Sequence, residues 1–335
     1  MTDETPTASS TPSISDSAIA ASAAPAVPST ARAVQLDNYG GVDVLHISPV
    51  VVARPAAGEV LVQVRAAGIN PGEAAIRQGY LDQMFPATFP SGEGTDFAGV
   101  VVAVGTGVDA FAVGDGVMGW SEKRSSQAEY VTVPEHQLIP KPAELSWEVA
   151  GSLFVAGVTA FAAVRAVSLA EGDTVVVSAA AGGVGSLAVQ LAKLKGAAVI
   201  GIASEANHGW LEARGVTPVA YGDGLADRIR ALAPGGIDAF IDTYGPEYLD
   251  LAVELGIAVD RIDTIIAFEA AGRIGAKAEG SSAASTTDAL GEVARLVAAG
   301  DVLVEIAATY PLNEVRAAFV ELEKHHTRGK IVLIP

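Results

Sequence analysis

The order of hydrophobic and polar residues divides the chain into two parts with different periodicity. From Arg32 to about Glu135, short apolar runs alternate with turns that contain glycine. Short apolar runs bounded by turn residues are typical of β-strands, so this part predicts an all-β or barrel-like module. Its predicted strands include Val60–Val64, Gly99–Val104 and Tyr130–Val133.

From Asp173 onward, strand-like and helix-like stretches alternate, which predicts parallel strands joined by crossover helices. The predicted strands are Thr174–Ser178, Ala198–Ile202, Pro218–Tyr221, Ile237–Asp242 and Thr264–Phe268. The predicted helices are Val184–Lys195, Leu225–Leu232 and Glu247–Leu255. A last helix over Asn313–Lys324 and a strand over Lys330–Ile334 are expected to return to the first part. The pattern therefore predicts an α/β protein with a β-rich domain and a doubly wound parallel sheet.

Composition and charge limit the classes of protein to which this chain can belong. A chain of 335 residues, 50% of them hydrophobic, is long enough for two domains with cores of their own. Its 21 basic and 39 acidic residues give a net charge of −18, so no nucleic-acid partner is expected. No apolar run approaches the roughly 20 residues that cross a bilayer, so no membrane association is expected either.

Residues 1–30 are rich in Ala, Ser, Thr and Pro and contain no Lys or Arg. Such a segment buries too little apolar surface to offset its ordering entropy, so we predict a disordered tail. A secretory signal would begin with basic residues and continue with an unbroken apolar stretch. Because both are missing, we expect a cytoplasmic protein whose tail is either inert or binds a partner.

The chain has no cysteine, which excludes disulfides, a cysteine nucleophile and thiolate metal sites. Its five histidines show none of the spacings that place two rings on one metal ion. His325 and His326 are neighbours, and adjacent residues of a helix do not share a face. No metal site is predicted.

A glycine-rich segment between a predicted strand and a predicted helix is the strongest local signal. Gly182 and Gly183 allow the backbone to turn tightly and approach a pyrophosphate, and Gly185 allows close contact between helix and strand. With Ala181 and Val184, they would present the free N–H groups of a helix N-terminus to phosphates. The first glycine of the usual G-x-G-x-x-G pattern is an alanine here, so a strand-turn-helix without ligand is the alternative.

The residues after the second predicted strand bear on the choice of cofactor. NAD-dependent enzymes place an acidic residue there to bind the ribose 2′-hydroxyl. Here the strand tip carries Gly201, and Ser204 and Asn207 could hold a 2′-phosphate, so NADPH is predicted. Glu205, if turned inward, would favour NAD instead. No Lys or Arg lies nearby in the sequence, so the predicted phosphate site is weakly charged.

Several motifs in order along residues 31–335 resemble one family. They are Ala33–Gly41, Ala67–Pro71, Gly94–Val101, Gly114–Asp115, Gly157–Ala160, Ala181–Gly185 and Gly329–Pro335. The chain resembles the zinc-free quinone oxidoreductase branch of the medium-chain dehydrogenase/reductase family, the group that contains zeta-crystallin. Zinc-dependent relatives carry Cys at the position of Asn70 and Gly-His-Glu at the positions of Gly94–Asp96. The resemblance therefore implies chemistry without zinc.

The resemblance also implies a domain organisation. It predicts a GroES-like catalytic domain over residues 31–155, a Rossmann NADPH-binding domain over 156–300, and a return to the catalytic domain over 301–335. Members of this branch are usually homodimers, so a homodimer is expected.

Further residue roles follow from the resemblance. Asn70 and Pro71 match the family position near the nicotinamide and the reacting centre, although an Asn-Pro turn explains Asn70 equally well. Thr159 matches a threonine near the nicotinamide ribose; the alternative is a hydroxyl at a helix terminus. Tyr221 matches a tyrosine at the adenosine end; the alternative is an ordinary strand tyrosine. Phe268 is predicted at the carboxyl edge of the sheet, where cofactors bind, and a core aromatic is the competing interpretation.

Tyr80 is the nearby phenol that could donate a proton or polarise an oxygen atom, so it is predicted with Asn70 as a catalytic residue. Quinone-reducing relatives often carry a tyrosine near the position of Ala75, so quinone and enone acceptors both stay open. The predicted function is an NADPH-dependent reductase that transfers hydride to a quinone or an α,β-unsaturated carbonyl compound. The alternatives are a non-catalytic, crystallin-like NADPH-binding protein and a zinc alcohol dehydrogenase that has lost its usual ligands.

Overall fold

The computed structural model describes residues 27–335, and residues 1–26 lie outside the described part. The predicted tail over residues 1–30 therefore falls almost entirely outside it. Its last residue, Thr30, begins strand β1 (Thr30–Leu36) by pairing with Val51. Among the described residues, no helix is both long and apolar enough to cross a membrane.

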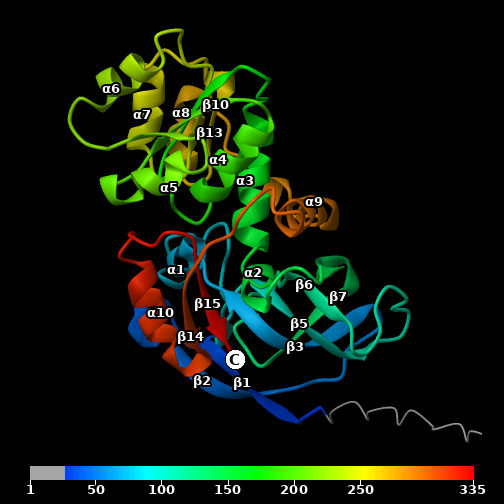
Figure 1. Cartoon of the computed structure of the whole chain (residues 1–335). Helices are drawn as coiled ribbons and strands as arrows, with labels where there is room; N and C mark the ends of the chain where they lie inside the picture. Colours follow the sequence, from blue (N-terminus) through cyan, green and yellow to red (C-terminus); the bar gives the residue numbers. More distant parts are fainter. Residues whose placement is uncertain (1–26) are drawn as a thin grey trace, which may run out of the picture.

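The β-rich domain is the lower part of Figure 1 and contains two sheets. The smaller sheet has the order β2-β1-β4 and the larger one the order β14-β15-β3-β5-β6-β8, with β7 also paired to β3. Their strands are β2 (His46–Val51), β3 (Glu59–Gly68), β4 (Ser91–Gly92), β5 (Asp96–Val104), β6 (Gly116–Trp120), β7 (Tyr130–Pro134), β8 (Leu138–Pro140), β14 (Ile306–Pro311) and β15 (Lys330–Ile334). The helices of this domain are α1 (Pro71–Arg77), α2 (Trp147–Ala150) and α10 (Val315–Leu322).

The upper domain is a five-stranded parallel sheet with the order β11-β10-β9-β12-β13. Its strands are β9 (Thr174–Val177), β10 (Ala198–Ile202), β11 (Thr217–Val219), β12 (Ala239–Asp242) and β13 (Ile262–Thr264). Its helices are α4 (Gly185–Leu194), α5 (His208–Glu212), α6 (Leu225–Leu232), α7 (Glu247–Glu254) and α8 (Phe268–Ile274). The strand order reverses at β9, so the predicted doubly wound α/β fold is confirmed.

The fifth parallel strand is shifted from its predicted position. Residues Thr264–Phe268 were expected to form it, but β13 ends at Thr264 and Phe268 begins α8. The Thr264 hydroxyl donates to Asp242 and accepts the N–H groups of Ile266 and Ala267, which ends the strand. The apolar pattern of residues 264–268 does not reveal this turn. The turn depends on the hydrogen bond between the Thr264 hydroxyl and Asp242, which belongs to the neighbouring strand β12.

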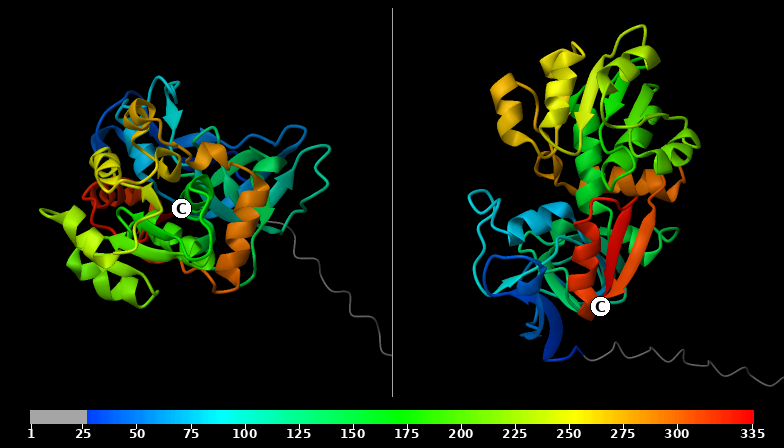
Figure 2. Two further views of the ribbon diagram at one scale, coloured as in Figure 1. Left: turned by 90° about the horizontal axis from the view of Figure 1, so that it is seen from above. Right: turned by 90° about the vertical axis from the view of Figure 1, so that its left-hand side faces the viewer.

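Two further helices join the domains. Helix α3 (Phe154–Ala166) is apolar on all sides, and ten of its thirteen residues are buried, as expected for a helix enclosed by its neighbours. Helix α9 (Thr287–Ala298) packs against α3, and the chain then returns to the β-rich domain. There β15 pairs with β3, with Val332 opposite Gly68. Figure 2 shows β14 and β15 beside α10 in the β-rich domain.

Candidate functional site: the glycine loop and the buried polar cluster

The glycine loop runs from the end of β9 to the start of α4. Ala179, one residue before the position of the pattern's first glycine (Ala180), has a left-handed backbone conformation with φ of 42°. Its carbonyl oxygen accepts the N–H of Gly182 at 2.8 Å, which closes a tight turn. Within residues 27–335, the N–H groups of Gly183 and Val184 have no hydrogen-bond partner. Free N–H groups at the start of a helix are the donors that a phosphate accepts from.

The three predicted glycines have different surroundings. A Cβ atom on Gly185 would lie 2.2 Å from the carbonyl oxygen of Ala179, so this glycine is required for contact between helix and strand. A Cβ on Gly182 would lie 3.2 Å from the same oxygen. On Gly183 the nearest atoms would be 3.5 Å away and belong to Gly329 and Lys330 of the returning segment. Gly185 therefore serves packing, whereas Gly183 has room that a ligand can use.

Asp242 joins the carboxyl ends of three parallel strands next to this loop. Its carboxylate accepts hydrogen bonds from the hydroxyls of Ser178 at 2.7 Å and Thr264 at 2.6 Å, and from the N–H groups of Tyr244 and Gly245. Burial raises the pKa of Asp242, and these donors oppose the shift. From the sequence, Asp242 was predicted only as the last residue of a strand. Its role could not be predicted, because the hydroxyl groups that bind it come from the ends of β9 and β13.

The residues predicted to hold a 2′-phosphate lie together beyond the end of β10. The side-chain amide of Asn207 donates to the Ser204 hydroxyl at 3.1 Å, and Glu205 between them is exposed. An acidic side chain has no room at Gly201, because a Cβ there would lie 2.8 Å from the Cβ of Ala180. The carboxyl edge of β10 therefore offers neutral hydrogen-bonding groups and one exposed carboxylate.

The fold adds a positive charge that the local sequence does not show. Arg228, from α6, donates to the carbonyl oxygens of Ala220 at 2.8 Å and Gly222 at 3.3 Å. Strand β11 pairs in parallel with β10, so this turn adjoins the carboxyl end that precedes Ser204. Sequence reasoning missed Arg228, and only the pairing of β10 with β11 could have indicated it.

Tyr221 lies in the same turn, outside β11, and is 56% exposed. The strand predicted over Pro218–Tyr221 therefore ends two residues earlier, at Val219, and Tyr221 is not a strand residue. Phe268 is 38% exposed at the start of α8, so the core interpretation is wrong as well. Thr159 is buried in the middle of α3, which excludes the alternative of a helix-terminus hydroxyl. Tyr80 follows α1 and is 78% exposed.

A cluster of buried polar side chains lies in the β-rich domain around Asn70. The amide nitrogen of Asn70 donates to Glu73 at 3.1 Å and to Asp96 at 3.3 Å, and its amide oxygen accepts from the ammonium group of Lys330. All three polar positions of the Asn70 side chain are thus paired. Pro71 follows as the first residue of α1, where its fixed φ suits a helix start.

Glu73 is the acceptor at the centre of this cluster. Besides the Asn70 side chain, it accepts the N–H of Asn70 at 3.0 Å, the N–H of Thr95 at 2.9 Å and the side-chain amide of Gln127 at 3.2 Å. Burial, and then the charge of Asp96, raise the pKa of Glu73 to about 7. Burial also raises the pKa of Asp96 and lowers that of Lys330, while their mutual attraction opposes both shifts.

The family resemblance places the zinc-ligand positions of zinc-dependent relatives within this cluster. They are occupied by Asn70, whose amide is fully paired, and by Thr95, whose hydroxyl is a poor zinc ligand. No group of three His, Asp or Glu side chains among residues 27–335 is arranged to hold a metal ion. The residues present therefore do not fit a catalytic zinc ion.

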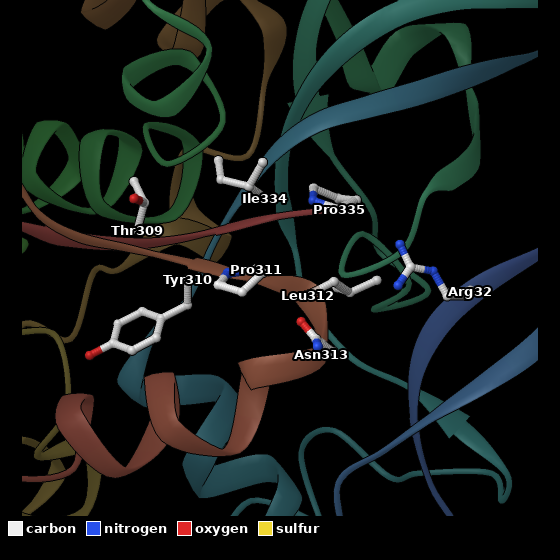
Figure 3. A pocket seen from close by; sticks show the side chains of 8 residues that line it. All are labelled: Arg32, Thr309, Tyr310, Pro311, Leu312, Asn313, Ile334 and Pro335. Atoms are coloured by element: carbon white, nitrogen blue, oxygen red, sulfur yellow. The ribbon is translucent and has the colours of Figure 1, made fainter.

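Two surface pockets lie at the other end of β15 from Lys330. One, of about 460 Å³, is lined by residues of β14 and by Arg32, Leu312, Asn313, Ile334 and Pro335 (Figure 3). The second, of about 370 Å³, adjoins it and includes Gln63 and Tyr130. Neither pocket includes a residue of the glycine loop or of the Asn70 cluster.

Comparison with known proteins agrees with this geometry. Residues 56–143 match the alcohol dehydrogenase GroES-like domain, and residues 214–333 match the zinc-binding dehydrogenase domain. A quinone oxidoreductase of Pseudomonas aeruginosa is 30% identical over 336 residues, covering 91% of this chain and 100% of that protein. The solved quinone oxidoreductase of Coxiella burnetii is 31% identical, with a TM-score of 0.83, over 91% of this chain and 99% of that one.

The chain belongs to the medium-chain dehydrogenase/reductase family, in its quinone oxidoreductase branch. The predicted resemblance and the GroES-like and Rossmann architecture are thereby confirmed. The synaptic vesicle membrane protein VAT-1 homolog of Rattus norvegicus is 37% identical over 220 residues, 64% of this chain and 54% of that protein. The chain thus spans about half the length of several curated relatives, although it aligns with the whole of others.

Proposed function

We propose that this protein is an NADPH-dependent, zinc-free reductase that transfers hydride to a quinone or to an α,β-unsaturated carbonyl compound. The observation that carries the proposal is the glycine loop. It combines close packing at Gly185, an open approach at Gly183 and unpaired N–H groups at a helix start. These features suit the pyrophosphate of a dinucleotide.

NADPH, rather than NADH, is proposed from the residues around Ser204. Ser204 and Asn207 supply hydrogen-bonding groups, and Arg228 supplies a positive charge in the neighbouring turn. Tyr221, exposed in that turn, can cover the adenosine end. Glu205 opposes the assignment, since a carboxylate turned inward would bind the 2′-hydroxyl of NADH instead.

The acceptor class follows from the absence of a zinc-binding ligand set at Asn70 and Thr95. Without a Lewis acid, an alcohol or an isolated carbonyl group lacks the polarisation that zinc provides. The reduced nicotinamide, when bound, supplies the hydride. A conjugated quinone or enone spreads the resulting negative charge, so hydrogen-bond donors are sufficient to stabilise it. Tyr80 is the proposed donor, and the protein's main task is to orient the reacting groups.

The test is a pair of fluorescence titrations with NADPH and NADH, followed by assays of NADPH oxidation with quinones and enones. Gly182→Asp, which places a carboxylate in the loop, is the control that must lose binding. Tighter binding of NADPH with turnover of either acceptor class supports the proposal. Equal or tighter binding of NADH would overturn the cofactor assignment. Binding of NADPH without turnover would favour a non-catalytic, crystallin-like protein.

Stoichiometric zinc in the purified protein would revive the alcohol dehydrogenase alternative. We also propose a homodimer, the usual state of this branch, which sedimentation analysis of the full chain measures directly.

A further inference from the structure

Lys330, the first residue of β15, is a buried cation with an unusual set of contacts. Its side chain is 4% exposed, and its ammonium group donates to the carbonyl oxygen of Ile69 at 3.1 Å and to the amide oxygen of Asn70. It lies 3.8 Å from the carboxylate of Asp96. A buried ion pair seldom stabilises a fold more than apolar residues of the same size would, so stability alone does not account for it.

The same segment contacts the glycine loop. The N–H of Gly329 donates to the carbonyl oxygen of Ala181 at 3.3 Å. The Cδ atom of Lys330 is 3.5 Å from the position that a Cβ on Gly183 would take. Gly329 has φ of 85°, and a Cβ there would lie 2.2 Å from the carbonyl oxygen of Glu305, so the segment cannot shift freely. The stem of Lys330 therefore lies beside the loop, and its charged end contacts Asn70.

We infer that Lys330 is a positioning residue, which acts through Asn70 to hold the Asn70–Pro71 turn in register with the glycine loop. The inference rests on the proposed function, together with the position near the nicotinamide that the family resemblance implies for this turn. Lys330 fixes the amide oxygen of Asn70, and this orientation directs the amide nitrogen to Glu73 and Asp96. Hydride transfer is sensitive to displacements of about 1 Å, so a loose turn slows it.

The charge of Lys330 also opposes the rise in the pKa of the two carboxyl groups near it, Glu73 and Asp96, that burial causes. Without the ammonium group, Asp96 keeps only the Asn70 amide and the N–H of Val155, at 2.9 Å, as donors. Its pKa, already raised by burial, rises further when Lys330 is removed. The pH dependence of turnover is therefore expected to shift upward in a variant that lacks this charge.

The test compares Lys330→Met, Lys330→Arg, Asn70→Ala and the double variant Asn70→Ala/Lys330→Met in the full chain. Lys141→Met is the matched control, because its ammonium group also donates to carbonyl oxygens, those of Pro142 and Leu145, but in another part of the domain. The readouts are the dissociation constant for NADPH, the emission spectrum of bound NADPH, kcat, KM for the acceptor and their pH profiles.

Lys330→Met is expected to lower kcat by about tenfold or more and to change the dissociation constant of NADPH by less than about threefold. Lys330→Arg should recover part of kcat. The double variant should be no slower than Asn70→Ala, because Lys330 acts through Asn70 and has no effect once that side chain is gone. A loss confined to NADPH affinity, or additive losses in the double variant, would overturn the inference.

The same variants still test the inference if the protein turns out not to be a reductase. If the wild type binds NADPH without turnover, the emission of bound NADPH still reports whether the nicotinamide end is held. An emission spectrum changed by Lys330→Met and by Asn70→Ala, but not by Lys141→Met, would then support the inference. Identical spectra in all variants would reject it.

Discussion

Replacing each of the three glycines of the loop by alanine separates packing from ligand binding. None of the three has a positive φ, so alanine meets no backbone strain at any of them, and only the space around the new Cβ differs. The distance from the new Cβ to the nearest atom is 2.2 Å at Gly185, 3.2 Å at Gly182 and 3.5 Å at Gly183. The structure therefore predicts graded losses of stability in that order.

The magnitudes follow from these distances. In Gly185→Ala, helix α4 must move by about 1 Å away from Ala179 and Ala180 in the turn after β9, and such overpacking costs about 1–3 kcal/mol. A loss near 2 kcal/mol lowers the melting temperature by about 4–8 °C in a domain of this size. Gly183→Ala is expected to change the free energy of unfolding by less than about 0.5 kcal/mol, since its contacts are ordinary. Its methyl group would nevertheless occupy the approach of the pyrophosphate, so NADPH affinity is expected to fall about tenfold or more.

Thermal unfolding without ligand and fluorescence titration with NADPH measure the two effects separately. Gly182→Ala, with intermediate spacing, should lose both stability and affinity to an intermediate degree. Melting of Gly185→Ala within about 1 °C of the wild type would refute the packing argument. Unchanged NADPH affinity in Gly183→Ala would refute the assignment of the loop as the phosphate site.

Three further predictions concern charges and hydrogen bonds. Glu73 loses its proton near pH 4.5 when unfolded and near pH 7 when folded, so its contribution to stability falls by about 3 kcal/mol as the pH rises between these values. In urea unfolding, the free energy of unfolding should decrease less steeply with pH over this range in Glu73→Gln than in the wild type. Equal slopes against pH in the two proteins would contradict the raised pKa of Glu73. Asp242→Asn is expected to lower the free energy of unfolding in urea by about 1–3 kcal/mol, because one of the four donors to Asp242 then faces an amide N–H. Unchanged stability would show that the carboxylate is dispensable. Arg228→Met should weaken NADPH binding about fivefold or more and leave NADH binding unchanged, whereas equal weakening of both cofactors would mean that Arg228 only supports its turn.

The fold was predictable from the sequence where local pattern and tertiary structure agree. The alternation of apolar runs after Asp173 indicated each parallel strand except the fifth, because buried strands of a doubly wound sheet are short and continuous in hydrophobicity. The fifth failed since Thr264 ends β13 by bonding Asp242 from the neighbouring strand. The returning segment that ends in β15 was expected from its pattern, and its pairing with β3 appears in the structure.

The candidate site was predictable only in its local part. The glycine loop could be identified because its strand, turn and helix are contiguous, and the steric need for Gly185 arises from Ala179 and Ala180, a few residues away. Arg228 and Lys330 could not be identified in this way. Arg228 reaches the site through the pairing of β10 with β11, and Lys330 reaches Asn70 through the pairing of β15 with β3.

By itself, the sequence determined the alternation of elements, the glycine-rich turn between strand and helix, and the absence of cysteine ligands, since each depends on residue types at short spacing. The tertiary structure decided which buried charges face one another: Lys330, Asn70, Glu73 and Asp96 come from three separate stretches of chain. The pKa shifts of Lys330, Glu73 and Asp96, and the position of Lys330 beside the glycine loop, arise from burial and distance. Those are properties of the packed molecule, and no short stretch of sequence specifies them.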